Sequence, residues 1–160
     1  MQVLAQNTQL RTLNLKGQAI GPKGAGALTN LHCLENLSLG FCDLDDGGFK
    51  ALPLLRLKTL KVPGNTLKAE SAKHLCETLK QVPSPHLNAL NLAANPLGDD
   101  AMEHLVSIRS LKKLDVTYVD GTTEGMQKLT LLSQLTRLLY AGNLLSPALE
   151  ATFAAVNHNG

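Results

Sequence analysis

Apolar and polar residues alternate over a short stretch near the middle of the chain, from Leu87 to Leu97. The stretch reads L-x-x-L-x-L-x-x-N-x-L, and Leu90 and Leu92 share one face of an extended backbone. Asn95 follows where such a strand would turn, and its side-chain amide can hydrogen-bond nearby backbone groups. The stretch therefore predicts a short, half-buried strand that ends in a turn.

The same pattern occurs six times along the chain. The repeats begin near residues 10, 34, 57, 87, 111 and 135, so successive starts differ by 24, 23, 30, 24 and 24 residues. This steady period indicates an array of stacked structural units. We expect strands of a single parallel sheet, centred on Leu13, Leu37, Leu60, Leu90, Leu114 and Leu138.

The second half of each repeat has apolar residues at three- and four-residue spacing. This spacing is typical of one face of a short helix. It predicts helices near residues 22–31, 46–54, 69–82, 99–108, 123–133 and 147–157. The segment over residues 3–9 resembles the tail of a further helix, and Pro83-Ser84-Pro85 ends the long third helix.

These motifs resemble the leucine-rich repeat superfamily over nearly the whole chain. The resemblance implies an α/β fold, a leucine-rich-repeat solenoid. It would be a right-handed horseshoe segment with a parallel sheet on the concave face and helices on the convex face. Residues 1–160 would form a single domain of about six repeats, and the alternative that they are a fragment of a longer array stays open.

Two features suggest a subtype of repeat. The segment from Ile20 to Leu28 reads I-G-P-K-G-A-G-A-L, similar to the GALA-type repeats of bacterial effectors, and the longer third repeat is similar to the ribonuclease-inhibitor type. Such effectors often join their repeats to an F-box, and no F-box-like segment occurs in these 160 residues. Because the motif departs from its pattern at Gln18, Val119 and Gly121, we expect the fifth repeat's turn to be the least regular.

Composition narrows the function classes. Aromatic residues make up only 3% of the chain, which suits stacked leucine layers, and the net charge of +2 has no block of one sign that would indicate a nucleic-acid surface. No apolar run approaches the roughly 18 residues of a membrane span, and the first residues lack a secretion signal. Three cysteines without C-x-x-C spacing favour a reducing compartment. We expect a cytoplasmic protein, or one secreted into a host cell without a cleavable signal peptide if it is an effector.

Candidate chemistry is sparse. His32-Cys33 and the His74/Cys76 pair offer two ligands each, whereas zinc requires four ligands, or three and a water. No serine-nucleophile, phosphate-loop or zinc-protease motif occurs. Cys42 takes the asparagine position of its repeat, where we expect a structural role. The sequence therefore predicts no enzyme activity, no cofactor and no metal.

The concave face remains as the candidate site, because its residues alternate with the buried leucines. Aromatic residues and arginine are enriched at binding hot spots. The predicted partner-binding residues are Phe41, Lys61, Asn91, Lys113, Asp115, Tyr118 and Arg137. Phe41 and Tyr118 stand three repeats apart, roughly 14 Å at about 4.8 Å per strand. With the small residues Pro63, Gly64, Ala93 and Ala94 between them, they predict a shallow cleft for an extended segment with an apolar anchor and negative charge.

The favoured function is a protein–protein interaction module that binds a macromolecular partner through its concave face, as an effector-like adaptor. One alternative is a GTPase-activating or other enzyme-regulating repeat protein, for which Asn91 and Arg137 are the candidate residues. Another is a structural or sensor segment of a longer repeat protein. Because a terminal repeat exposes the leucines that a neighbour would cover, we also expect an exposed apolar edge at one end.

Overall fold

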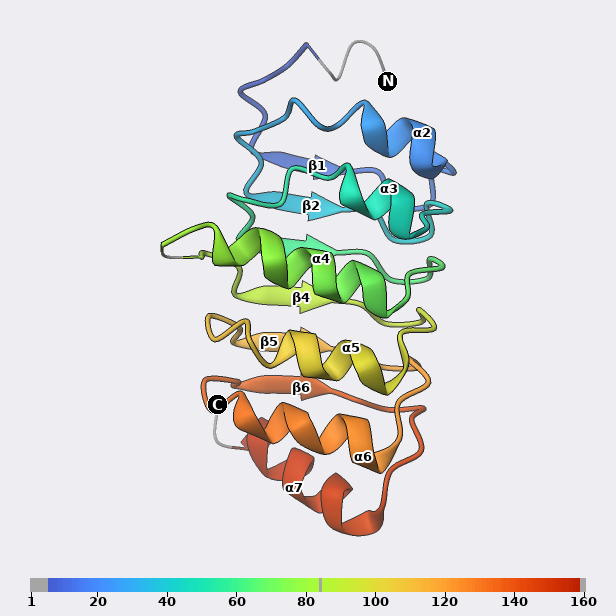
Figure 1. Ribbon diagram of the computed structural model, residues 1–160, viewed down its shortest axis with the longest axis vertical. Helices are drawn as coiled ribbons and strands as arrows, with labels where there is room; N and C mark the ends of the chain where they lie inside the picture. Colours follow the sequence, from blue (N-terminus) through green and yellow to red (C-terminus); the bar gives the residue numbers. More distant parts are fainter. Residues whose placement is uncertain (1–5, 84, 159–160) are drawn as a thin grey trace.

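Six short strands form one parallel sheet in chain order (Figure 1). The computed structural model describes residues 6–83 and 85–158. The strands are β1 (Thr12–Asn14), β2 (Asn36–Ser38), β3 (Thr59–Lys61), β4 (Ala89–Asn91), β5 (Lys113–Asp115) and β6 (Arg137–Leu139). Each strand has a leucine at its centre, and these leucines pair in register from Leu13 to Leu138. The predicted sheet and its six strand centres are confirmed.

The helices all lie on one face of this sheet (Figure 1). They are α2 (Gly21–Gly26), α3 (Asp46–Lys50), α4 (Ala69–Lys80), α5 (Gly98–Leu105), α6 (Thr123–Met126), the 3-10 helix η1 (Gln127–Leu131) and α7 (Pro147–His158). Each predicted helix is present, but α2, α3 and α5 end three or more residues early, and the helix predicted over residues 123–133 is α-helical only in α6 and continues as η1. Half of α2 is glycine, and α3 contains Gly47 and Gly48, which lowers the helix propensity of both.

Two expectations fall partly outside the described residues: the helix tail over residues 3–9 and the stop at Pro83-Ser84-Pro85. Among the described residues, no helix is both long and apolar enough to cross a bilayer.

The core is a leucine column between the sheet and the helices. Side chains from every repeat join one buried cluster, to which α3 and α7 add Phe49 and Phe153, both almost completely buried. The column is less complete at its ends. Leu10 and Ile20 are half-buried in the first repeat, and Leu135 and Leu145 are half-buried in the sixth. Leu144 is 80% exposed, in line with the expected apolar edge.

Asparagine side chains tie three of the turns to the repeat before them. Asn95 accepts a hydrogen bond from the Leu67 backbone N–H (3.1 Å) and donates to the carbonyls of Val62 (3.0 Å) and Leu92 (2.9 Å). Asn65 and Asn143 make the same kind of contacts one repeat earlier and two repeats later. The prediction that the Asn95 amide binds backbone at the strand end is confirmed.

In repeats without this asparagine, other groups stabilise the turn. The Cys42 thiol donates to the Leu15 carbonyl (3.1 Å), and burial raises the pKa of that thiol, which keeps it a donor. The residues that follow Cys42 and Val119 are Asp43 and Asp120, with φ of 57° and 58°. The second and fifth turns therefore share a residue with positive φ at this position. That the fifth turn is the least regular of the six stays a prediction.

Candidate functional site

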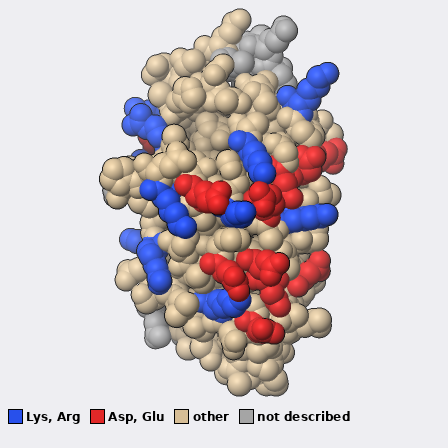
Figure 2. Space-filling view, in the orientation of Figure 1, with Lys and Arg blue, Asp and Glu red and all other residues tan. Residues whose placement is uncertain are grey.

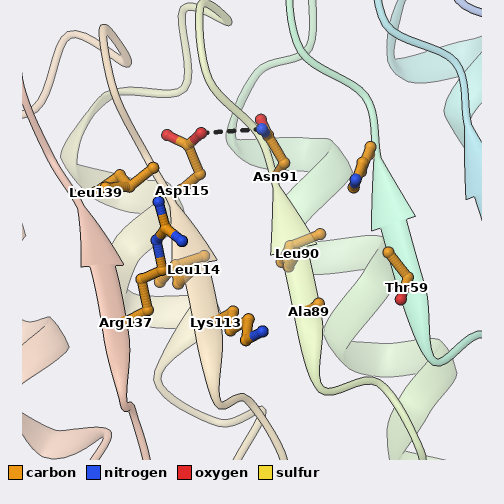
Figure 3. A pocket seen from close by; sticks show the side chains of 10 residues that line it. Thr59, Ala89, Leu90, Asn91, Lys113, Leu114, Asp115, Arg137 and Leu139 are labelled. Atoms are coloured by element: carbon orange, nitrogen blue, oxygen red, sulfur yellow. Dashed lines mark hydrogen bonds between the residues drawn. The ribbon is translucent and has the colours of Figure 1, made fainter. Parts of the chain in front are cut away.

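The sheet face that the helices leave uncovered, here called the open face, is hollowed over β3 to β6 (Figure 3). This sheet hollow has a volume of about 270 Å³. It is lined by Thr59, Lys61, Ala89, Leu90, Asn91, Lys113, Leu114, Asp115, Arg137 and Leu139. Because strand side chains alternate, the first and third residue of each strand face outward and the central leucine faces the core. The three-residue strands thus present two outward side chains each.

The charge of the sheet hollow is mainly positive. Lys61, Lys113 and Arg137 line it, and Asp115 is its single acid. Among the described residues, the four ion pairs use other cations: Arg11, Lys50, Lys58 and Lys128. Figure 2 shows acidic and basic side chains intermingled on the helix-covered face, in contrast to the hollow. The cations of the hollow are thus left to interact with a ligand.

Asn91 and Asp115 are held in place at the strand ends. Asn91 donates from Nδ2 to Asp115 Oδ2 at 2.9 Å (Figure 3). Asn91 Oδ1 also accepts from the Ala93 N–H (3.0 Å), and Asp115 Oδ1 accepts from the Thr117 N–H (3.1 Å). The single carboxylate of the hollow is therefore already hydrogen-bonded within the sheet.

The open face is hollowed beyond this region as well. Over β1 to β3 a second hollow of about 330 Å³ shares Thr59 and Lys61 with the first, and its other polar side chains are uncharged: Thr12, Asn14, Asn36 and Ser38. Past β6 a third hollow of about 530 Å³ continues from Lys113 and Arg137 to Asn157. The open face is thus a trough along the array, neutral at β1 and β2 and positive from β3 onward.

Phe41 and Tyr118 lie elsewhere, in the turns that follow β2 and β5. Their backbones have positive φ, 55° and 52°, and their side chains are 55% and 64% exposed. The Phe41 ring lies over Gly64, where an added Cβ would come within 2.3 Å of it, and the Tyr118 ring lies over Gly142. The Lys16 ammonium is 5.9 Å from the Phe41 ring centroid.

The structure therefore separates the seven predicted residues into two groups. Five of them line the sheet hollow: Lys61, Asn91, Lys113, Asp115 and Arg137. The two aromatic residues sit on the turns, and Gly64, predicted as open floor between them, is covered by the Phe41 ring. That all seven bind a partner stays a prediction.

Five lining residues were not among the candidates: the central leucines Leu90 and Leu114, and the outward-facing Thr59, Ala89 and Leu139. Leu139 is a large apolar side chain on the open face, and 39% of it is exposed. Strand alternation alone identifies the three outward-facing positions, since each is the first or third residue of its strand. Charge and aromaticity, by which the candidates were chosen, do not identify these positions.

The His74/Cys76 pair makes structural contacts. The Cys76 thiol donates to the His104 carbonyl (3.0 Å), and the His74 ring lies 3.5 Å from the Thr78 hydroxyl. All three cysteines are free thiols. Over residues 6–83 and 85–158 no three histidine, cysteine or acidic residues gather in a way that could hold a metal ion.

Comparison with known proteins gives one family and a shared fold. The family model described as Leucine Rich repeat matches residues 6–28, 30–52 and 84–106. The tropomodulin C-terminal domain of Caenorhabditis elegans superposes with a TM-score of 0.62 and 16% identity, over 83% of this chain and 88% of that one. An internalin (inlF) from Listeria monocytogenes str. 4b F2365 is 18% identical, with a TM-score of 0.49, over 91% of this chain and 52% of that one. No curated protein matches.

The matched segments cover the first, second and fourth repeats, whose strands pair in one sheet with those of the unmatched repeats. The tropomodulin domain, at its low identity, shares the fold. The same order of strand, turn and helix recurs along the sheet, and an asparagine or cysteine side chain ties the turn in four of the six repeats. The chain therefore has the α/β fold of a leucine-rich-repeat solenoid.

Proposed function

We propose that the chain is a protein–protein interaction module whose open face binds an extended, negatively charged segment of a partner protein. Leucine-rich repeats generally mediate protein–protein interaction, which supports the class of function. The observation that carries the choice of surface is the sheet hollow. There Lys61, Lys113 and Arg137 surround apolar side chains, and the one acid, Asp115, is hydrogen-bonded to Asn91.

The arrangement of the cations suits a chain of acidic residues. Lys61, Lys113 and Arg137 stand on β3, β5 and β6, so the outer two are three strand spacings apart, roughly 14 Å. An extended segment covers that length in about four residues. Arginine binds carboxylate in a bidentate manner, while the lysines act as mobile point charges.

Apolar contact comes from Ala89 and Leu139, which flank the cations in the same hollow. We therefore expect one apolar anchor in the bound segment, placed between or beside its acids. The hollow is open to solvent along the trough, whereas small cofactors bind in enclosed pockets. A polypeptide ligand fits this geometry better than a small molecule.

Two narrower hypotheses concern an effector-like adaptor and a GTPase activator. The GALA-like segment Ile20–Leu28 supports an effector-like adaptor that acts inside a cell, and three free thiols agree with a reducing compartment. The GTPase-activating alternative would use Asn91 and Arg137, but the Asn91 amide is already bonded to Asp115 and to Ala93. We therefore favour the interaction module.

Selection of random peptides against the intact chain tests this proposal. We expect enriched peptides to carry several Asp or Glu residues and one apolar residue. In fluorescence anisotropy, Lys113→Glu with Arg137→Glu should weaken the binding of an enriched peptide about 100-fold, at roughly 1.4 kcal/mol for each lost charged contact. The affinity should also fall as salt is raised.

A matched control reverses two cations on the helix-covered side, Lys23→Glu in α2 and Lys80→Glu in α4. Both double variants take the formal net charge from +2 to −2, so a general field effect would weaken binding equally. We expect the control to retain its affinity. Equal losses in the two variants, or enriched peptides without acidic residues, would contradict the proposed site.

A second pair of substitutions tests the aromatic residues on the turns. The double variant Phe41→Asn with Tyr118→Asn places asparagine, which tolerates positive φ, at both positions, so the turns should stay folded. If the rings touch the partner, peptide affinity should fall about tenfold, as expected for aromatic hot spots. Unchanged affinity would restrict Phe41 and Tyr118 to covering Gly64 and Gly142.

A further inference from the structure

The sheet ends at β6, and the edge of this strand has a defined set of exposed backbone groups. In a parallel ladder, successive residues direct their N–H and C=O groups to opposite sides. Arg137 donates to the Lys112 carbonyl (3.1 Å), and Leu139 accepts from the Val116 N–H (2.9 Å), both toward β5. The N–H and C=O of Leu138 therefore face away from β5, where a further strand would pair.

Both of these groups are bound by one side chain of the last helix. The Leu138 N–H donates to Asn157 Oδ1 at 2.8 Å, and Asn157 Nδ2 donates to the Leu138 carbonyl at 2.9 Å. A carboxamide offers the same donor and acceptor as a peptide group. Asn157 thus occupies the place that the backbone of a neighbouring strand would take.

Helix α7 holds Asn157 in this place through aromatic packing. Phe153, one turn earlier, is buried, and its ring centroid lies 5.1 Å from that of Tyr140. The Tyr140 hydroxyl donates to the Glu150 carbonyl at 3.2 Å, which ties the turn after β6 to the same helix. The cap is therefore a positioned contact between packed elements.

We propose that Asn157 is an edge cap and that the β6 edge beneath it is a docking site for the β1 edge of a second copy of this chain. β1 presents the complementary groups. On the side that faces β2, the Asn36 N–H donates to the Arg11 carbonyl and the Leu15 N–H donates to the Ser38 carbonyl. Because successive residues of a strand alternate, Thr12 and Asn14 direct their backbone groups away from β2. A second copy placed head to tail would continue the ladder in the same register.

The side chains at the two ends support this occupant over an unrelated strand. Leu10 and Ile20 are half-buried at the first repeat, and Leu135 and Leu145 are half-buried at the sixth. Leu10 and Leu135 occupy the same motif position, as do Ile20 and Leu145, and within the array such positions pack against their neighbours. Head-to-tail docking would bury the half-buried apolar side chains of both terminal repeats. Because such an arrangement does not close into a ring, it would yield open-ended oligomers.

The variant Asn157→Ala tests the cap in the full chain. Alanine is the better helix former, so α7 should stay folded while both hydrogen bonds are lost. Amide exchange at Leu138, followed by NMR, should become about tenfold faster, as expected for loss of one net hydrogen bond. In sedimentation velocity, the variant should form dimers and longer species as concentration rises, while the wild type stays smaller at equal concentration.

Three further variants make the outcomes distinguishable. Asn157→Asp keeps an acceptor for the Leu138 N–H but has no donor for its carbonyl, so its exchange rate should be intermediate. Thr152→Ala, on the same helix, removes only a contact to the Ala148 carbonyl and should resemble the wild type. Thr12→Pro removes the outward N–H of β1, and added to Asn157→Ala it should reverse the association.

Two results would overturn the proposal. Unchanged exchange at Leu138 in Asn157→Ala would show that Asn157 does not protect the edge. Association of Asn157→Ala that persists with Thr12→Pro, or no association at any concentration, would exclude the β1 edge of a second copy as the occupant.

Discussion

Replacing Asn95 by alanine is expected to lower the free energy of unfolding by about 4 kcal/mol. The substitution leaves two buried groups, the Leu67 N–H and the Leu92 carbonyl, without the partner that Asn95 provides. The Val62 carbonyl keeps a second donor, the Asn65 amide, and should contribute less. Each unsatisfied buried group costs roughly 1–3 kcal/mol, so two of them account for most of the expected loss.

Equilibrium urea unfolding followed by circular dichroism measures this effect. Asn91→Ala is the matched control, because Asn91 lies four residues earlier, on the half-buried open face where water can replace its partners. We expect the control to lose less than about 1 kcal/mol. Similar losses in both variants would mean that the buried asparagines do not hold the turns to the preceding repeats.

Phe49→Ala should be about as destabilising, with an expected loss of roughly 3–5 kcal/mol. Phe49 is fully buried in α3 between the sheet and the helices, and its removal leaves a cavity among leucines that cannot collapse fully. The same unfolding experiment measures the change.

Phe41→Ala provides the same chemical change at an exposed position. Alanine at a φ of 55° is as unfavourable as phenylalanine, so the backbone strain is unchanged, and only the contacts of the ring with Gly64 and Lys16 are lost. We expect a loss of about 1 kcal/mol or less. If Phe41→Ala proved as destabilising as Phe49→Ala, the Phe41 ring would be part of the structural core rather than a candidate contact.

The strand positions could be predicted residue by residue because the motif repeats. One outward residue between two inward apolar residues, polar in five of the six copies, determines which side of each strand is buried. Helix ends were less predictable, since the glycines of α2 and α3 end those helices before the apolar spacing does. The second turn was more predictable, because Cys42 takes the asparagine position of the motif and donates to the Leu15 carbonyl from there.

The candidate site was partly predictable for the same reason. Lys61, Lys113 and Arg137 are outward residues of regular strands, so alternation places them together. Phe41 and Tyr118 lie beyond the strands, where positive φ turns their rings onto the glycines of the next repeat, and alternation no longer applies. The Asn157 cap depends on where α7 ends relative to β6, which a repeat pattern does not contain.

Amide chemical-shift mapping tests the central claim, that the open face binds an acidic segment, most directly. The ¹⁵N-labelled chain would be titrated with a selected acidic peptide and with the same peptide after Asp and Glu are replaced by Asn and Gln. We predict that saturable shifts occur in β3 to β6, around Lys61, Asn91, Lys113 and Arg137, and that the neutral peptide produces much smaller ones. Shifts concentrated on helices α2 to α7, or equal shifts with both peptides, would contradict the account.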